Sequence, residues 1–245
     1  MSLGLNFIDQ IQTLIAKVKD SESDNIAKAA SLVADAIEND GLLHVFGCGH
    51  SQMYAEELFY RAGGLVPVNP ILEPALSLRP EAPKSTAFER MEGLGKVIVA
   101  NENMKEGDVL IIASTSGRNA VPVEVALEAQ ERGVKVIGLT SLEFTSEVSS
   151  RHSSGKKLID FSDVVLDNGG VPGDAMMELA SLPYKFGPTS SIVGFTLLQA
   201  IVVQTIEELA KRGKEAPVWV SSNLDKGDAI NKVHLAKYKN RIKCL

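Results

Sequence analysis

Aromatic residues and cysteines are scarce in this sequence of 245 residues. Phe, Trp and Tyr together make up 5% of the chain, and its two cysteines are Cys48 and Cys244. Two isolated cysteines supply neither a zinc-binding spacing nor a disulfide framework. We therefore expect reduced thiols, with Cys48 as a small packed residue rather than a catalytic nucleophile, and we predict no metal and no cofactor.

An excess of basic residues and long apolar runs are also lacking. Lysine and arginine number 25 against 31 acidic residues, for a formal charge of −6, and the absence of a basic stripe argues against nucleic acid as a partner. The longest apolar stretch, 192–203, is interrupted by Thr196 and Gln199, so we expect no bilayer span. Asp9 interrupts any signal-peptide pattern early. The expected location is cytoplasmic, with no membrane partner.

The apolar residues that are present form strand-like runs and helically spaced stripes in alternation. Strands are expected at 42–46, 65–68, 108–113, 134–140 and 164–166. Helices are expected over 3–39 with a break at 21–24, from the residues after 51 to about 62, and over 89–100, 120–132, 188–212 and 224–239. Strands that alternate with helices predict a three-layer α/β/α sandwich around a five-stranded parallel sheet.

We expect this sandwich to form a single domain over 1–245. Its parts are N-terminal helices over 1–40, an α/β core over 41–212 and a C-terminal extension over 213–245. The stretch 69–90 is rich in proline, which predicts irregular structure. In the last long helix, Gly187 is the expected N-cap and Pro188 the first helical residue.

Two short loops rich in glycine and hydroxyl residues carry the functional signal. Residues 47–51 (Gly-Cys-Gly-His-Ser) follow one predicted strand, and residues 114–119 (Ser-Thr-Ser-Gly-Arg-Asn) follow another. Each loop opens a predicted helix, whose first N–H groups and positive end attract anions. Two such loops predict a phosphate site at the carboxyl edge of the sheet.

Two other interpretations of these loops remain open. Ser51, Ser114 and Ser116 are also typical helix N-caps, which would give the loops a structural role alone. A dinucleotide site is a weaker alternative, because the first loop lacks the full three-glycine fingerprint.

The order of these motifs resembles the sugar isomerase (SIS) domain, a flavodoxin-like fold, over roughly 25–212. The resemblance rests on the loop ending at Ser51, on 114–119, on Lys156 and on 163–166. The segments 151–158, 167–169 and 187–190 are similar to a bacterial branch of single-SIS-domain proteins that resembles phosphoheptose isomerase.

The resemblance implies that a phosphorylated sugar is the ligand. By motif matching, Gly49, Ser51, Ser114, Ser116 and Asn119 would bind the phosphosugar, and Thr115 would contribute its backbone amide. Arg118 departs from the family pattern, where a neutral or acidic residue is common. It either adds a positive charge to the phosphate site or points to solvent.

Acid–base candidates are glutamates and histidines near these loops. The resemblance implies a glutamate base on the helix after the first loop, which makes Glu57 and Glu56 the candidates. Their spacing from Ser51 is shorter than in the heptose isomerases, by about one helical turn. His50, within the first loop, and His152, after the fourth predicted strand, are candidates for ring opening or proton transfer.

Further polar residues are candidate sugar ligands, each with a structural alternative. Lys156 would bind the sugar or pair with Asp163. Asp167 and Asn168 end the fifth predicted strand and would bind sugar hydroxyls, or form a turn with Gly169. Thr189 and Ser190 open the long helix and would cap it or contact the ligand.

The function implied by the resemblance is an aldose–ketose sugar-phosphate isomerase. The alternatives are a non-catalytic sugar-phosphate sensor or regulatory protein, and a sugar-phosphate lyase or etherase. Apolar stripes on the helices of 3–39 and 190–209 predict self-association, and family members commonly form dimers or tetramers. We therefore expect a homodimer or homotetramer.

Overall fold

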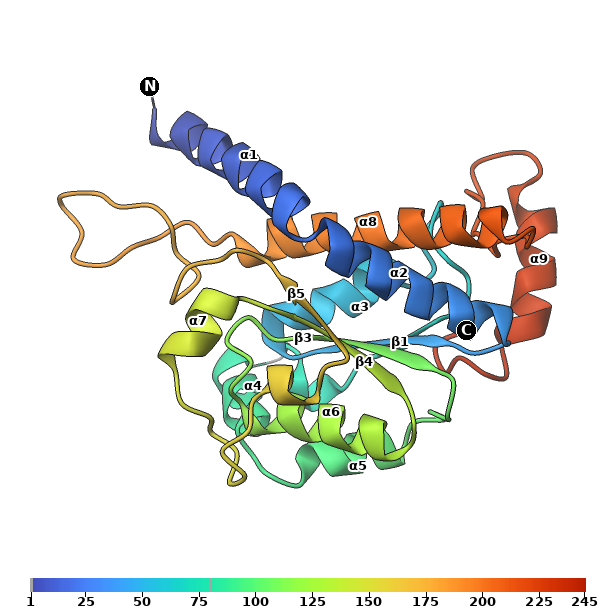
Figure 1. Cartoon of the computed structure of the whole chain (residues 1–245), viewed down its shortest axis with the longest axis horizontal. Coiled ribbons are helices and arrows are strands. Elements are labelled where there is room, and N and C mark those ends of the chain that lie inside the picture. Colours follow the sequence, from blue (N-terminus) through green and yellow to red (C-terminus); the bar gives the residue numbers. More distant parts are fainter. Residues whose placement is uncertain (1, 80) are drawn as a thin grey trace.

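The computed structural model describes residues 2–79 and 81–245. Within them, five parallel strands form one sheet in the order β2-β1-β3-β4-β5 (Figure 1). The strands are β1 Leu43–Gly47, β2 Val68–Ile71, β3 Val109–Ala113, β4 Lys135–Thr140 and β5 Val164–Asp167. The predicted α/β fold with a five-stranded parallel sheet and an N-terminal helical region is confirmed.

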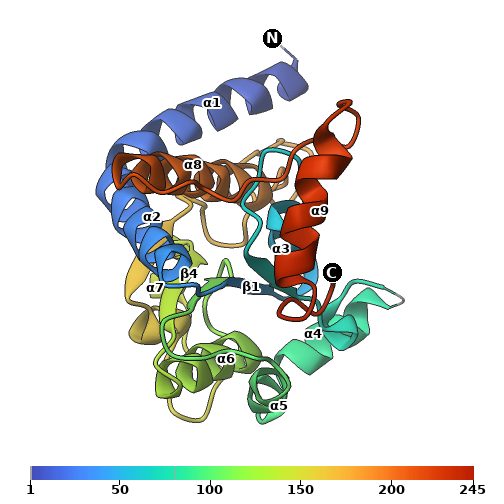
Figure 2. The same ribbon diagram turned by 90° about the vertical axis from the view of Figure 1, so that its right-hand side faces the viewer.

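Helices cover both faces of this sheet (Figure 2). The α-helices are α1 Leu3–Ser21, α2 Ser23–Glu38, α3 Met53–Leu58, α4 Ala82–Glu89, α5 Leu94–Ala100, α6 Ala120–Glu131, α7 Leu142–Glu147, α8 Ser190–Lys211 and α9 Gly227–Tyr238. Short 3-10 helices are η1 Gly49–Gln52, η2 Pro74–Leu76 and η3 Leu158–Phe161. The side chains of α2, α3 and α8 share one apolar core with the sheet, and those of α5 and α6 share another.

The strand side chains alternate between these two cores. Val109 and Ile111 pack with α2 and α8, whereas Leu110 and Ile112 pack with α5 and α6. Because successive strand residues point to opposite faces, a strand covered on both sides must be apolar throughout. This explains the continuous apolar runs in the sequence.

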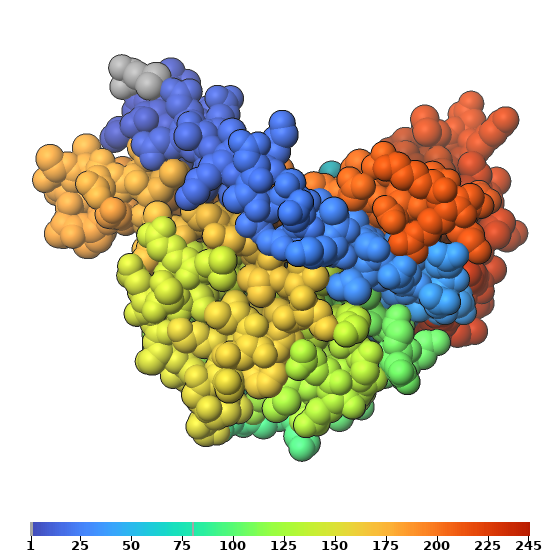
Figure 3. All heavy atoms as spheres, in the orientation of Figure 1, coloured from blue at the N-terminus to red at the C-terminus, as the bar shows by residue number. Residues whose placement is uncertain are grey.

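The first part of the chain and the segment before α8 protrude together from the body (Figures 1 and 3). α1 ends at Ser21 and α2 begins at Ser23, so the predicted break between the two N-terminal helices is present. The segments touch, because a Cβ on Gly187 would lie 3.2 Å from Cε2 of Phe7.

The long helix α8 begins later than the sequence indicates. Its N-cap is Thr189 rather than Gly187, and Pro188 precedes the helix. The reason is that Gly187 has φ +80° and follows Phe186, which pairs with Met177 in an antiparallel bridge. The carboxylate of Asp174 then accepts hydrogen bonds from the amides of Thr189 and Ser190.

The helix after the first loop and the second strand also differ from expectation. α3 ends at Leu58 rather than near 62, and β2 begins at Val68 rather than at 65. Both changes follow from contacts with the C-terminal extension. The ring of Tyr60 lies 4.7 Å from that of Trp219, and Leu65 forms an antiparallel bridge with Val218.

The proline-rich stretch 69–90 is more regular than predicted. It contains the end of β2, η2 and α4. Pro74 and Pro83 lie at the first or second positions of η2 and α4, where the missing N–H carries no cost. Pro70 lies in β2, an edge strand that tolerates proline; Pro80 is outside the described residues.

The helix α8 is more apolar than the sequence analysis indicated. It has 22 residues and, by length and composition alone, could cross a membrane, contrary to the expectation that no apolar stretch is long enough for a bilayer span. In this fold α8 covers the sheet, with Leu198 and Ile201 each 1% exposed. The core helix of a folded domain satisfies the same criteria.

Candidate functional site

The two glycine- and hydroxyl-rich loops lie side by side at the carboxyl edge of the sheet. β1 and β3 are neighbouring parallel strands, and Gly47 is paired in register with Ala113. The first loop therefore leaves the sheet beside the second. This is the arrangement that the sequence predicted.

Two glycines allow the chain to turn tightly at this edge. A Cβ on Gly47 would lie 2.3 Å from the carbonyl oxygen of Ser51, so the first loop can fold back only over a glycine. Gly117 has φ +60°, which favours glycine, and a Cβ there would lie 3.3 Å from the hydroxyl oxygens of Thr140 and Thr145. Gly49 also has a positive φ, +57°, and begins η1.

The second loop is anchored through its carbonyl groups. The carbonyl of Thr115 accepts from the amide of Ser141 at 3.0 Å, and that of Ser116 accepts from Thr145 Oγ1 at 3.1 Å. The carbonyl of Arg118 accepts from the amide of Arg151 at 2.8 Å. Neighbouring elements thus hold the acceptor side of the loop.

The donor side of the same loop stays open. Within residues 2–79 and 81–245, no group accepts a hydrogen bond from the amides of Thr115, Ser116 or Arg118. The hydroxyls of Ser51, Ser114 and Ser116 likewise bond to no described residue. α6 begins directly after this loop, and its positive end adds to the attraction for an anion. Open amides and hydroxyls next to a helix N-terminus make a surface of the kind that binds anions in proteins.

Arginine side chains add positive charge beside this surface. Arg151 Nη1 donates to Asn119 Oδ1 at 2.8 Å, and Arg118 Nη2 donates to Ser149 Oγ at 3.4 Å. Arg118 Nε is buried and has no hydrogen-bond partner among the described residues. Burial, and then the charges of Arg118 and Arg90, lower the pKa of Arg151. Arg151 is thus close enough to Arg118 and to Arg90 for their positive charges to repel its own.

Glu89 completes the cluster, and sequence reasoning missed it. It is the last residue of α4, and its Oε1 accepts from Asn119 Nδ2 at 2.8 Å. Burial raises the pKa of the Glu89 carboxyl, against the hydrogen bond from Asn119 and the charges of Arg90 and Arg151. Burial, and then the charge of Glu89, also raise the pKa of the Cys48 thiol. Because α4 also packs against η1 of the first loop, Glu89 lies near both loops.

The glutamates predicted on the helix after the first loop are placed differently. Glu57 accepts from Arg61 at 2.9 Å and from Gln199 of α8 at 3.0 Å. Glu56 is exposed, as is His50. The carboxylate of Glu57 is therefore held toward α8, where it neutralises Arg61.

His152 and Lys156 lie in the segment that covers the second loop. His152 Nδ1 bonds with Ser154 Oγ at 2.7 Å, and its Nε2 lies 3.7 Å from Glu124. Lys156 pairs with Asp160 at 3.6 Å, while Asp163 pairs with Lys135 at 2.8 Å. The alternative that Lys156 pairs with Asp163 is therefore wrong.

The predicted ligands at the end of β5 and the start of α8 are engaged in local structure. Asp167 Oδ1 accepts from the amides of Leu142 and Gly169. Asn168 Oδ1 accepts from the amide of Gly170 at 2.9 Å. The hydroxyls of Thr189 and Ser190 donate to Asp174. They are therefore used in hydrogen bonds that cap the start of α8.

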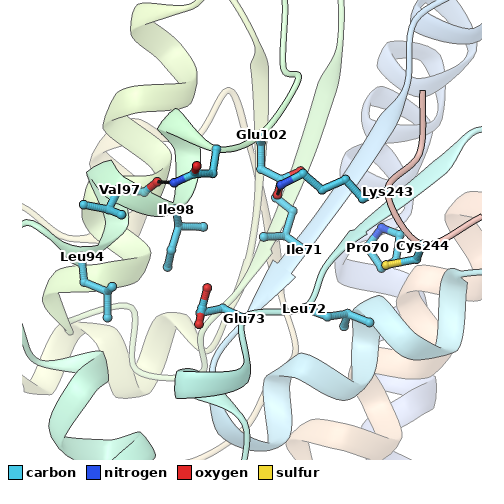
Figure 4. A pocket seen from close by; sticks show the side chains of 11 residues that line it. Pro70, Ile71, Leu72, Glu73, Leu94, Val97, Ile98, Glu102, Lys243 and Cys244 are labelled. Carbon is cyan, nitrogen blue, oxygen red and sulfur yellow. Dashed lines mark hydrogen bonds and ion pairs between the residues drawn. The ribbon is translucent and has the colours of Figure 1, made fainter. Parts of the chain in front are cut away.

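A separate pocket of about 390 Å³ lies beside the edge strand β2 (Figure 4). Its lining residues are Pro70, Ile71, Leu72, Glu73, Leu94, Val97, Ile98, Asn101, Glu102, Lys243 and Cys244. None of them belongs to the two loops. Among the described residues, no group of three His, Cys, Asp or Glu side chains is placed to hold a metal ion.

A buried polar chain leads from this pocket to the other end of the sheet. Lys243 pairs with Glu102 at 2.7 Å, and Asn69 Nδ2 donates both to Glu102 and to His44 Nδ1. His44 Nδ1 is therefore an acceptor, so its Nε2 carries the hydrogen and donates to Asp108 at 3.2 Å. His44 is a buried residue of the sheet, 1% exposed.

Comparison with known proteins places these features in a family. Residues 6–141, more than half of the chain, match the family model of the SIS domain. A UPF0309 protein of Listeria monocytogenes serotype 4b is 43% identical over 240 residues, which cover 98% of this chain and 97% of the relative. A UPF0309 protein of Shouchella clausii is 42% identical over 243 residues, covering 99% of each chain.

Two solved structures share the fold at low sequence identity. A phosphoheptose isomerase from Neisseria gonorrhoeae aligns with a TM-score of 0.52 and 21% identity, over 81% of this chain and 94% of its own. One from Francisella tularensis aligns with a TM-score of 0.53 and 17% identity, over 84% of this chain and all of its own. Together with the match over 6–141, these relatives confirm the resemblance noted in the sequence: the chain belongs to the SIS-domain family.

Proposed function

We propose that the chain binds a phosphorylated sugar by its phosphate at the two loops and interconverts its aldose and ketose forms. The observation that carries the binding proposal is the pair of adjacent loops with open donors. The amides of Thr115 and Ser116 and the hydroxyls of Ser51, Ser114 and Ser116 lack partners within the described residues. A phosphate dianion supplies acceptors to several such donors at once.

Arg118 and Arg151 support an anionic ligand over a neutral one. Their guanidinium groups lie beside the open donors of the second loop, where Arg151 Nη1 donates to Asn119 and Arg118 Nη2 to Ser149, and positive charge there favours an anion. The sugar component of the proposal rests on the family, since two structural neighbours are phosphoheptose isomerases. Gly49, Asn119 and the hydroxyl of Ser51 would then surround the phosphate.

A non-catalytic sensor is the second candidate function. It is favoured by the placement of Glu57, which pairs with Arg61 and Gln199 rather than facing the loops. A sensor would bind the same ligand without exchanging its protons. A lyase or etherase would use the same phosphate site with a different bond cleaved, so turnover separates these three functions.

The binding proposal is tested by ligand-induced thermal stabilisation. We would screen glucose 6-phosphate, fructose 6-phosphate, sedoheptulose 7-phosphate, glucosamine 6-phosphate and N-acetylmuramic acid 6-phosphate. A ligand that binds the folded state alone raises the unfolding midpoint. The variant Ser116→Ala removes one open hydroxyl, and Ser222→Ala removes an exposed hydroxyl before α9 as a matched control.

We expect one phosphosugar to stabilise the wild type and Ser222→Ala, and to stabilise Ser116→Ala much less. The matching unphosphorylated sugar should have no effect. Equal stabilisation of Ser116→Ala and wild type would contradict binding at the second loop. No stabilisation by any phosphosugar would contradict the proposal as a whole.

A further inference from the structure

We propose that Glu89 is the carboxyl group that moves the proton in this site, in the role that the resemblance implied for Glu57 or Glu56. The inference rests on the proposed function, because it requires a sugar bound at the two loops. It names a residue from α4, an element that lies in the stretch predicted to be irregular.

The position of Glu89 carries the inference. Its Oε1 accepts from Asn119, the residue that precedes α6, and its helix α4 packs against η1 of the first loop. A sugar phosphate held by open donors of both loops would place its carbons beside Glu89. Glu89 is half-buried, so the carboxyl group is shielded from bulk water yet accessible to a ligand.

The partners of Glu89 favour a carboxyl group that exchanges protons. Arg90 and Arg151 lie near enough to affect its pKa, but no described lysine or arginine forms an ion pair with it within 4.0 Å. Burial outweighs these charges and raises the pKa of Glu89. A base works best when its pKa is near the operating pH, and burial is the usual way to raise a carboxyl group toward that range.

Other nearby carboxylates are committed to structural roles. Glu124 accepts from the amides of Gly93 and Gly95. Glu92 accepts from the amide and hydroxyl of Ser153, and these bonds lower its pKa. A carboxylate stabilised in its charged form by such donors is a weak base.

The proposed step is balanced and needs no co-reactant. The Glu89 carboxylate takes the proton on C2 of the open-chain aldose phosphate. The C2–H electron pair forms a C1=C2 double bond, and O1 takes the proton of the O2 hydroxyl. In the second half, the negative O2 forms the C2=O2 carbonyl of the ketose. The C1=C2 electron pair then takes the proton from Glu89 at C1, which restores the Glu89 carboxylate. Asn119 and Arg151 are positioning residues for this carboxyl group.

The test separates proton transfer from binding with Glu89→Gln. Glutamine keeps the shape of the side chain and an oxygen that accepts from Asn119, so the variant should fold. Glu81→Gln, an exposed change just before α4, is the matched control. In D2O, NMR would follow deuterium uptake at C1 and C2 of the phosphosugar that stabilises the wild type, and thermal shift would follow its binding.

We expect Glu89→Gln to keep the stabilisation by ligand and to lose deuterium uptake by at least about 100-fold. Glu81→Gln should match wild type in both, and Glu89→Asp should recover part of the uptake. Uptake at the wild-type rate in Glu89→Gln would overturn the assignment of Glu89. Stabilisation of the wild type without uptake or turnover would overturn it while leaving phosphosugar binding intact. No stabilisation of the wild type would overturn the proposed function and, with it, this inference.

Discussion

Asn119 Nδ2 donates a hydrogen bond of 2.8 Å to Glu89 Oε1, while Asn119 Oδ1 accepts one of 2.8 Å from Arg151. One amide side chain thus joins a carboxyl group and a guanidinium group that lie too far apart to pair directly. Asn119 is the N-cap position of α6, yet its side chain forms no capping hydrogen bond. Its side chain is used to arrange the charged groups beside the second loop.

Replacing Arg151 should weaken phosphosugar binding. In Arg151→Gln the site loses a positive charge and the donor that holds Asn119, so we expect about a tenfold rise in Kd, equal to about 1.4 kcal/mol. Isothermal titration calorimetry with the stabilising phosphosugar measures this change. Arg132→Gln, at the opposite end of α6, serves as the control, and an unchanged Kd in Arg151→Gln would show that Arg151 lies outside the binding surface.

Replacing Glu89 should make the protein more stable at alkaline pH. The folded-state pKa of Glu89 is raised above its unfolded value, so ionisation of this group in the folded protein is unfavourable. The penalty grows as the pH rises through the folded pKa and vanishes below the unfolded one. We expect the free energy of unfolding of Glu89→Gln to exceed that of the wild type by about 1 kcal/mol at pH 8. At pH 4 the two proteins should be equally stable.

Chemical denaturation at the two pH values tests the prediction for Glu89. Glu81→Gln should show no pH-dependent difference from wild type. A loss of stability in Glu89→Gln at pH 8 would mean that the ionised carboxylate stabilises the fold, contrary to the expected cost of its burial.

Asp108 should contribute strongly to stability above its ordinary pKa of 3.8. Burial alone would raise the pKa of this carboxyl group, but hydrogen bonds from His44, Leu42 and Lys105 outweigh burial and lower it. In Asp108→Asn the new NH2 group cannot accept a hydrogen bond, so one of these donors loses its acceptor. His44 also loses its charged partner. We expect a loss of about 3 kcal/mol at pH 7.

The pH dependence gives a second test of Asp108. Because its folded pKa is lowered, its contribution is complete above the unfolded pKa and is lost as the pH falls through the folded one. The difference between wild type and Asp108→Asn should therefore shrink below about pH 4. Asp20→Asn, an exposed change in α1, is the control, and a difference that stays constant down to acid pH would rule out this ionisation as the source.

The exposed face of α1 leads us to propose that a second copy of this chain packs on it. Leu5 and Ile8 are 56% and 51% exposed in the single chain. Farther along α1, an apolar groove of about 190 Å³ runs between the N-terminal helices and α8. Exposed apolar surface of this kind marks interfaces.

Light scattering coupled to size-exclusion chromatography tests this self-association. We expect a dimer or tetramer for the wild type and a shift toward monomer for Leu5→Glu with Ile8→Glu. Leu224→Glu, an exposed change before α9, should leave the mass unchanged. A wild-type protein that elutes as a monomer at micromolar concentration would contradict the proposal.

The two loops could be predicted from the sequence because their signal is local. A strand, a turn of glycine and serine, and a helix follow one another directly, so the loop 114–119 lies where it was expected. Glu89 could not be found in this way. The first turn of its helix contains Pro83, in a stretch whose prolines indicated irregular structure, and its partner Asn119 lies 30 residues away.

The errors near the site arise from contacts between distant segments. The expected helix to about 62 stops at Leu58 because Tyr60 packs against Trp219 of the C-terminal extension. The expected start of α8 at Pro188 moves because Asp174 provides the capping carboxylate. Neither partner is visible in a local sequence pattern, since each depends on how the chain folds back on itself.

The most direct test of the central claim is a crystal structure with the stabilising phosphosugar bound. We predict that the phosphate lies within hydrogen-bond distance of the amides of Thr115 and Ser116 and of the hydroxyls of Ser51 and Ser114. The sugar carbons should then lie beside Glu89. A phosphosugar bound elsewhere, for example near Lys243 in the pocket beside β2, with the two loops empty, would contradict the account.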